Sequence, residues 1–266
     1  MPDFQRAILT HGGAGSDPKD FDGPRSAANR GMDLMANGGT ALTAVVDAVK
    51  VLEDDPRFNA GSGSKLRIDR RTMQLDASCM TSSNEFGAVA CVENIKNPIE
   101  LASGVLRYSP HILIVGDGVR IFAEEHHIPV SGLNGSCQAD SPGTSCDTVG
   151  AVAFDGTTFA AALSSGGLEK SAMGRVGDVP LPGCGLFCGA SGAVACTGDG
   201  EFIALKLLAN KVYTWLESSM GPDEAAQKAI TLFDRYVDIG IIILTRNGFA
   251  SNARNGMAWS HITERK

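Results

Sequence analysis

The spacing of apolar residues predicts two helices near the amino end of the chain. The first is expected over 24–35, where Asn37-Gly38-Gly39 ends it. Thr40 then has the side chain of a helix cap, and apolar positions recur every three or four residues until Pro56. These positions form one stripe that packs on a flat surface: Leu42, Val45, Val46, Val49 and Leu52.

Short apolar runs bounded by turn residues predict strands in the rest of the chain. They lie at 7–10, 65–68, 74–79, 86–92, 112–115, 148–154, 159–164, 192–196 and 239–244. Asn247-Gly248 predicts a hairpin that leads into a further strand from Phe249. Other helices are expected from Asn97-Pro98 and over 201–218 and 222–236.

Strands and helices are grouped along the chain and do not alternate. This order favours antiparallel sheets in the middle with helices outside, and we expect one α+β domain over residues 1–266. The composition, 43% hydrophobic and 20% charged, is that of a globular protein with a sizeable core.

The charge balance argues against polyanionic partners. The formal net charge is -7, and no basic cluster is longer than Asp69-Arg70-Arg71. We therefore expect no nucleic acid and no membrane as partner, which leaves a small polar substrate open. The first residues lack a secretory signal, and the seven cysteines contain no Cys-x-x-Cys pair, so free thiols and a cytoplasmic location are expected.

The 32 glycines cluster between the predicted elements, which favours tight turns and close approach of the backbone to a ligand. Polar groups stand beside them. The Asn59 amide could donate to an oxyanion, although Asn-x-Gly is more often a turn. Ser165 could orient a nucleophile or could simply end a strand. The segment Thr197-Gly198-Asp199-Gly200 opens a helix, whose free N–H groups could bind an anion.

Two further segments carry chemistry that depends on context. Arg175 and Asp178 match the carboxylate and ammonium of an amino acid, although a surface ion pair is the usual explanation. Thr148 opens an apolar strand, where a β-branched residue is ordinarily structural. If the bond after Asp147 were cut, Thr148 would carry both a hydroxyl nucleophile and an α-amine able to act as its base.

Together these segments resemble the plant-type asparaginase family of N-terminal-nucleophile hydrolases, also called isoaspartyl peptidases, which has glycosylasparaginase among its relatives. The resemblance covers nearly the whole chain, and the order of its motifs is specific. The motifs lie at 11–15, 52–56, 59–61, 76–78, 95–99, 147–150 and 255–257. It implies a four-layer αββα sandwich, and we expect a homodimer of αβ units.

The resemblance implies self-cleavage before Thr148, which would leave chains of residues 1–147 and 148–266. Thr148 would then attack a side-chain amide and release aspartate from L-asparagine or β-aspartyl dipeptides. Asp147 favours glycosylasparagine as an alternative substrate, since many asparaginases of this group carry Gly there.

The same resemblance assigns roles within the site. Thr197 and Asn59 would stabilise the oxyanion, and Ser165 would support the nucleophile. Arg175 would bind the substrate α-carboxylate. The groups that would hold the α-ammonium are Asp178 and the main-chain carbonyls of Gly198 and Gly200.

The family also has a loop that holds a sodium ion by main-chain carbonyls. It corresponds to Leu52, Glu53, Asp55, Phe58, Ala60 and Ser62. No organic cofactor is expected, because Ile121 stands where the third glycine of a dinucleotide motif at 114–118 belongs, and the chain has no P-loop lysine motif.

Three departures limit the resemblance. The family usually has Thr at Ser165, Ser or Thr at Val179, and a Met-Asp-Gly turn where Thr81 follows Met80. They leave a second hypothesis, a family member that folds without maturing and acts as a binding or structural protein.

Overall fold

The computed structural model describes residues 3–132 and 148–266, which form two β-sheets with helices against them. The larger sheet has the order β11-β1-β5-β6-β2-β3-β4, and the smaller has the order β10-β9-β8-β7. The strands are β1 (Phe4–Ala14), β2 (Leu75–Thr81), β3 (Phe86–Val92), β4 (Leu113–Val115), β5 (Val149–Phe154), β6 (Phe159–Ser165), β7 (Leu186–Gly189), β8 (Gly192–Gly198), β9 (Ile239–Leu244), β10 (Phe249–Ala253) and β11 (Met257–Arg265).

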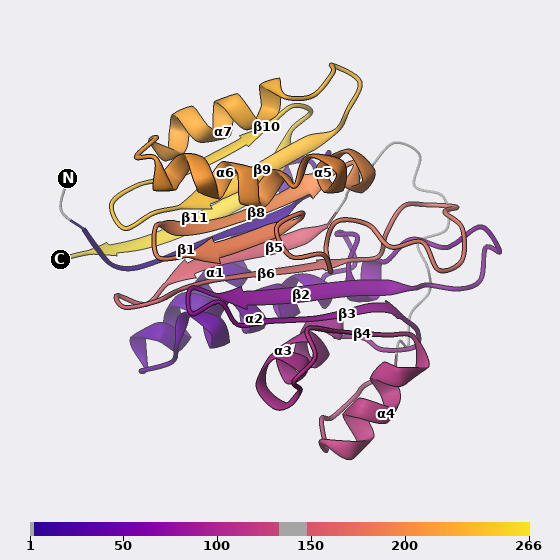
Figure 1. Cartoon of the computed structure of the whole chain (residues 1–266). Coiled ribbons are helices and arrows are strands. Elements are labelled where there is room, and N and C mark those ends of the chain that lie inside the picture. Colours follow the sequence, from indigo (N-terminus) through magenta and orange to yellow (C-terminus); the bar gives the residue numbers. More distant parts are fainter. Residues whose placement is uncertain (1–2, 133–147) are drawn as a thin grey trace.

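The helices are grouped on two sides of the molecule (Figure 1). One group has α1 (Asp22–Ala36), α2 (Ala41–Glu53), α3 (Pro98–Tyr108) and α4 (Asp117–Glu125), with short 3-10 turns η1 (Pro18–Phe21) and η2 (Gly61–Gly63). The other has α5 (Gly200–Lys206), α6 (Leu208–Glu217) and α7 (Pro222–Thr231). Each helix of the described ranges is too short or too polar to cross a bilayer.

Three apolar clusters hold these elements together. The first lies between the larger sheet and α1–α3, and it contains the predicted α2 positions Val45, Val49 and Leu52. The second lies between the two sheets, and the third lies between the smaller sheet and α6 and α7. Alternate residues of each central strand contribute to different clusters, because side chains along a strand point to opposite faces. The two sheets therefore stack face to face.

Most predicted elements are confirmed, including the Thr40 cap, whose hydroxyl accepts from the Thr43 N–H, and the hairpin between β9 and β10. Antiparallel pairing holds everywhere except between β3 and β4. That pair is parallel because α3 carries the chain across between them. Elements that the pattern missed are β7, β11 and α4.

One predicted strand does not form, and two predicted helices have other bounds. Residues 65–68 form no strand, because the Arg67 N–H donates to Thr72 and the Ile68 N–H to Ser171 instead of to a ladder. The helix predicted over 201–218 is interrupted at Leu207, whose backbone is left-handed. The helix predicted to Tyr236 ends at Thr231.

Arg254, which follows β10, explains this early end of α7. Its guanidinium donates to carbonyl oxygens at and beyond the helix end, those of Ile230, Phe233, Asp234 and Val237. These carbonyls would otherwise lack partners at a helix terminus. The periodicity of the sequence cannot predict this helix end, because Arg254 lies 20 residues from Asp234 in the chain.

Gly87 on β3 tests how tightly α3 packs on the larger sheet. A Cβ atom there would lie 2.3 Å from the Ala102 carbonyl oxygen and 2.4 Å from the Leu106 nitrogen. We expect Gly87→Ala to lower the free energy of unfolding by about 2 kcal/mol or more, because backbone cannot retreat as a side chain can. Urea unfolding measures this. Gly118→Ala on α4 is the control, since its nearest neighbour would be Ile114 Cγ2 at 3.4 Å; equal losses in both variants would contradict the packing argument.

Candidate active site

The candidate nucleophile lies in a row of polar residues across three strands of the larger sheet. Thr148 stands directly before β5, where Val149 pairs with Ser164 of β6. Thr148 therefore lies beside Ser165, and Ser165 pairs in turn with Asp76 of β2. Residues that pair across strands point to the same face. That face is the one turned toward the smaller sheet, since Leu163 and Met80 of the same strands belong to the cluster between the sheets.

The smaller sheet contributes Thr197, at the end of β8. Ala193 and Ala195, which lie on the same face of β8 as Thr197, belong to the cluster between the sheets. Thr197 therefore also faces the larger sheet. Thr197 is fully buried, and its hydroxyl oxygen accepts from the Ala14 N–H at 3.0 Å. The glycine-rich end of β1 is thereby tied to β8.

A small pocket opens between these groups. It is lined by Asp76, Thr148, Ser165, Gly167, Leu168, Arg175, Gly177, Asp178, Val179, Gly198 and Gly200. Six of the eight predicted catalytic and substrate-binding residues are in this lining. The other two, Asn59 and Thr197, lie behind it and contact the lining through Gly167 and Gly198.

Arg175 is held in one orientation by Glu201. The guanidinium donates from Nε to Glu201 Oε1 at 2.9 Å and from Nη2 to Oε2 at 2.7 Å. No side chain among the described residues accepts a hydrogen bond from Nη1, and the edge between Nη1 and Nη2 has the geometry that a second carboxylate requires. Hydrogen bonds from Arg175 hold the pKa of Glu201 below its usual value.

Two glycines leave the space that the guanidinium occupies. A Cβ at Gly177 would lie 3.0 Å from Arg175 Nη1, and a Cβ at Gly200 would lie 3.0 Å from Nη2. Side chains at these positions would push the guanidinium away from the pocket.

Asp178 supplies negative charge in the same pocket. It is 3% exposed, and its Oδ2 has no hydrogen-bond partner among the described residues. Burial raises the pKa of Asp178 to about 7, although the charge of Arg175 acts in the opposite direction. A buried carboxylate oxygen without a donor is suited to a cationic ligand group, because that group would restore the lost solvation.

Asn59 holds the end of β6 in place. Its Nδ2 donates to the Gly167 carbonyl at 2.8 Å, and its main-chain carbonyl accepts from the Gly166 N–H at 2.9 Å. The Ser165 hydroxyl oxygen accepts from the Gly167 N–H at 3.0 Å. The Asn59 loop and the end of β6 are thus one hydrogen-bonded unit behind Thr148.

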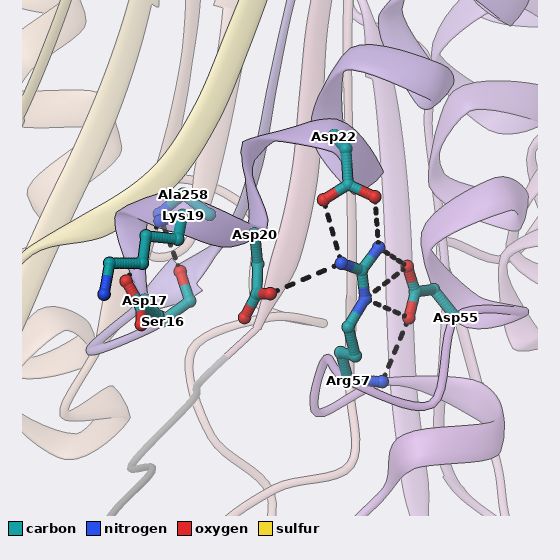
Figure 2. Close-up of polar contacts among 8 residues, drawn as sticks. All are labelled: Ser16, Asp17, Lys19, Asp20, Asp22, Asp55, Arg57 and Ala258. Atoms are coloured by element: carbon teal, nitrogen blue, oxygen red, sulfur yellow. Dashed lines mark hydrogen bonds and ion pairs between the residues drawn. The ribbon is translucent and has the colours of Figure 1, made fainter.

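The Asn59 loop is itself fixed by Arg57, whose guanidinium lies among three carboxylates (Figure 2). Arg57 donates to Asp55 at 2.6 Å, to Asp22 of α1 at 2.8 Å and to Asp20 of η1 at 3.3 Å. Single exposed ion pairs are weak, but several charges around one Arg form a network. The network ties the Asn59 loop to the start of α1.

Main-chain carbonyl oxygens lie close to two glycines of the loop where the resemblance implies a sodium site. A Cβ at Gly61 would lie 2.5 Å from the Glu53 oxygen, and one at Gly63 would lie 2.1 Å from the Phe58 oxygen. The carbonyls of Asp55, Phe58 and Ala60 each accept one backbone N–H, which leaves each a second lone pair. Neutral oxygens of this kind fit a monovalent cation. Within residues 3–132 and 148–266, no group of three His, Cys, Asp or Glu side chains could hold a metal.

Comparisons with known proteins show which family this chain resembles. A family model described as Asparaginase matches residues 4–134 and 130–266. An isoaspartyl peptidase/L-asparaginase of Xenopus laevis is 34% identical over 97% of this chain and 92% of its own length. A plant-type L-asparaginase of Pyrococcus furiosus is 35% identical over 94% of this chain and 93% of its own, and an isoaspartyl peptidase/L-asparaginase of Mus musculus is 34% identical over 99% and 90%.

The chain belongs to the plant-type asparaginase family.

In this asparaginase family member, the residues predicted from the sequence include six that line the pocket, but not Asp76, which also lines it, nor Glu201, which binds Arg175. In the sequence, Asp76 is part of the motif at 76–78 and Glu201 begins a predicted helix. The sequence does indicate a special role for Asp76, because this carboxylate lies within a buried strand. Asp147 lies outside the described residues.

The orienting role of Glu201 predicts an effect on ligand affinity. We expect Glu201→Gln to weaken L-aspartate binding about fivefold, because an ion pair with one exposed partner contributes about 1 kcal/mol. Titration calorimetry of the purified protein measures it. Glu217→Gln at the exposed end of α6 is the control and should bind normally. Unchanged affinity of Glu201→Gln would show that Arg175 is oriented without Glu201.

Proposed function

We propose that this chain is a hydrolase that releases aspartate from L-asparagine and β-aspartyl dipeptides, with Thr148 as the nucleophile. The observation that carries the proposal is that Thr148 shares one pocket with Arg175 and Asp178. A hydroxyl nucleophile thus lies beside groups complementary to the two charges of an amino acid. The names of the relatives, which include L-asparaginase and isoaspartyl peptidase, support the same substrates.

Maturation would cut the bond between Asp147 and Thr148. The Thr148 hydroxyl would attack the Asp147 carbonyl carbon and form an ester as the C–N bond breaks, which would free the Thr148 amine. Water would then hydrolyse the ester, leaving a carboxylate on Asp147 and a free hydroxyl on Thr148. That amine, whose ordinary pKa is about 8, would then be the general base for the hydroxyl. The products would be chains of residues 1–147 and 148–266.

Catalysis would proceed through an acyl-enzyme. The Thr148 oxygen would bond to the carbonyl carbon of the substrate side chain, and the C–N bond would break as the leaving amine takes a proton. Water would then cleave the ester and release aspartate. The Ser165 hydroxyl, on the strand next to Thr148, would support the nucleophile.

Thr197 and Asn59 would stabilise the oxyanion of each tetrahedral intermediate. The Thr197 oxygen accepts from Ala14, so its hydroxyl hydrogen is left to donate. The Asn59 amide has two N–H groups and gives one to Gly167. Loss of one oxyanion donor typically costs about 3 kcal/mol of barrier.

The substrate would be held by its α-amino acid end. Its α-carboxylate would bind the free edge of the Arg175 guanidinium, while Glu201 occupies the other edge. Its α-ammonium would face Asp178 and the carbonyls of Gly198 and Gly200. Two sheets stacked between two groups of helices support the four-layer αββα arrangement for this chain.

A sodium ion would brace the Asn59 loop. The carbonyls of Leu52, Glu53, Asp55, Phe58, Ala60 and Ser62 would hold it. Bound there, the ion would supply positive charge that keeps these oxygens together, and it would take no part in bond breaking.

Thr148 provides the first test. Intact mass of the purified protein should give two fragments that meet at Thr148, whereas Thr148→Ala should remain one chain without amidase activity, because it has no hydroxyl to attack Asp147. Thr157→Ala, in the exposed turn after β5, should cleave as the natural chain does. A natural chain that stays whole after long incubation would favour the family member that folds without maturing.

The leaving group is tested by comparing amides. Ammonia or amine release should be measured from L-asparagine, β-aspartyl-leucine and a glycosylasparagine under identical conditions. We expect the first two to be hydrolysed, since Arg175 and Asp178 would bind only the charged groups of the aspartyl portion. A preference of more than about tenfold for glycosylasparagine, or 1.4 kcal/mol in barrier, would assign the alternative activity.

A further inference from the structure

Polar side chains recur at every second position along one face of β2. Gln74 precedes the strand, and Asp76 and Ser78 follow at alternate positions. The intervening Leu75 and Ala77 are fully buried. Since side chains alternate along a strand, the three polar residues share the face turned toward the smaller sheet. A row of polar groups on a buried face requires partners.

The two end members of this row hydrogen-bond to the loop that carries Arg175 and Asp178. Gln74 Oε1 accepts from the Gly174 N–H at 2.7 Å. The Ser78 hydroxyl donates to the Val179 carbonyl at 2.5 Å. Between them, Asp76 lines the pocket together with Gly177. The loop over 174–179 is therefore attached to β2 at its beginning and end, and Asp76 lies beneath its middle.

Asp76 also binds the opposite strand. The pairing of β2 with β3 shifts between Leu75 and Ala77, and Cys91 at this bulge has a left-handed backbone with φ of 53°. The bulge turns the Cys91 N–H toward Asp76, whose Oδ1 accepts it at 2.9 Å. Bulges of this kind re-aim groups beside active sites, and a left-handed cysteine costs energy that its surroundings must offset.

Asp76 is in addition a charged wall of the pocket. It is 1% exposed and lines the pocket together with Thr148 and Arg175. Arg67 and Arg175 stabilise its negative charge, whereas Asp178 and Asp76 repel each other. Burial outweighs the two arginines and raises the pKa of Asp76 to about 6, so the carboxylate is charged at neutral pH.

We propose that Asp76 is a positioning residue for substrate recognition, which supports the middle of the loop between Gln74 and Ser78 so that Arg175 and Asp178 face Thr148. The proposal rests on the proposed function, because it concerns the same pocket. Asp76 acts through the loop and does not touch the reacting bond. Its loss should therefore weaken substrate binding while the chemistry at Thr148 continues.

Asp76→Asn tests this directly. The amide keeps the size of the side chain but removes the negative charge that faces the loop and Arg175. We expect KM for L-asparagine to rise about tenfold or more, because hydrogen bonds to charged groups are strong, with kcat changed less than about threefold. Cleavage before Thr148 should go to completion by intact mass. A fall in kcat at unchanged KM, or failure to cleave, would overturn the proposal.

Ser78→Ala provides a second variant that removes no charge. It deletes only the hydrogen bond to the Val179 carbonyl, so KM should rise in the same direction by about threefold. Asp155→Asn is the matched control, since Asp155 accepts from the Ala41 N–H at the start of α2, away from the pocket. It should lower the melting temperature without changing KM. Unchanged KM in both Asp76→Asn and Ser78→Ala would overturn the proposal even if Asp76→Asn folds poorly.

The Cys91→Gly substitution distinguishes the role of Asp76 at the bulge from its role at the loop. Glycine adopts a left-handed backbone without strain, so the double variant Asp76→Asn, Cys91→Gly should regain thermal stability. Its KM should stay raised, because the carboxylate beneath the loop is still missing. A return of KM to the natural value would mean that Asp76 serves only the bulge, which would overturn the proposal.

Failure of the proposed function is distinguishable from failure of this proposal. If the natural protein hydrolyses none of the amides, its affinity for L-aspartate by titration calorimetry replaces KM as the measure. Weaker L-aspartate binding in Asp76→Asn and in Ser78→Ala would then support the positioning role. Equal affinity in all three proteins would overturn it.

Discussion

The site depends on the register of three adjacent strands. β5, β6 and β2 pair so that Thr148, Ser165 and Asp76 stand side by side and point between the two sheets. A shift of one residue in any of these pairings would turn a whole strand over and send its polar residue into the helix-side core. Apolar clusters on both faces oppose such a shift, because residues on alternate sides are already buried. Packing of the core thus fixes the position of the candidate nucleophile.

Charge in the pocket is stabilised poorly by the protein alone. Burial raises the pKa values of Asp76 and Asp178 to about 6 and about 7. The folded chain therefore holds these protons more tightly than the unfolded chain, and the stability this gives is lost as the pH rises from about 4 through these values. Glu201 already engages one edge of Arg175. An entering ammonium would supply the missing positive charge, so a cationic ligand would stabilise the charged forms of these two carboxylates.

The sequence predicted the ordering of elements and most of the pocket, because both leave local signals. The α2 stripe, the Thr40 cap and the β9–β10 turn are each encoded within a few residues. Contacts between distant segments leave no such signal. The Arg254 cap on α7, the parallel β4 and the Glu201 partner of Arg175 all depend on groups brought together by the tertiary fold. Alternating polar residues on β2 were visible in the sequence, but their loop partners lie about 100 residues away.

The departures from the family pattern have local physical explanations. Val179 places its side chain in the cluster between the sheets, and the loop is held there through its main-chain carbonyl by Ser78. A hydroxyl at position 179 is therefore not needed to attach this end of the loop. Ser165 uses its oxygen to accept from Gly167, a bond that needs no methyl group. Thr81 donates to Glu85 within the turn between β2 and β3 and lies outside the pocket lining. Each of the three substitutions that motivated the hypothesis of a non-maturing protein thus has a local place in the packing or hydrogen bonding of the described residues.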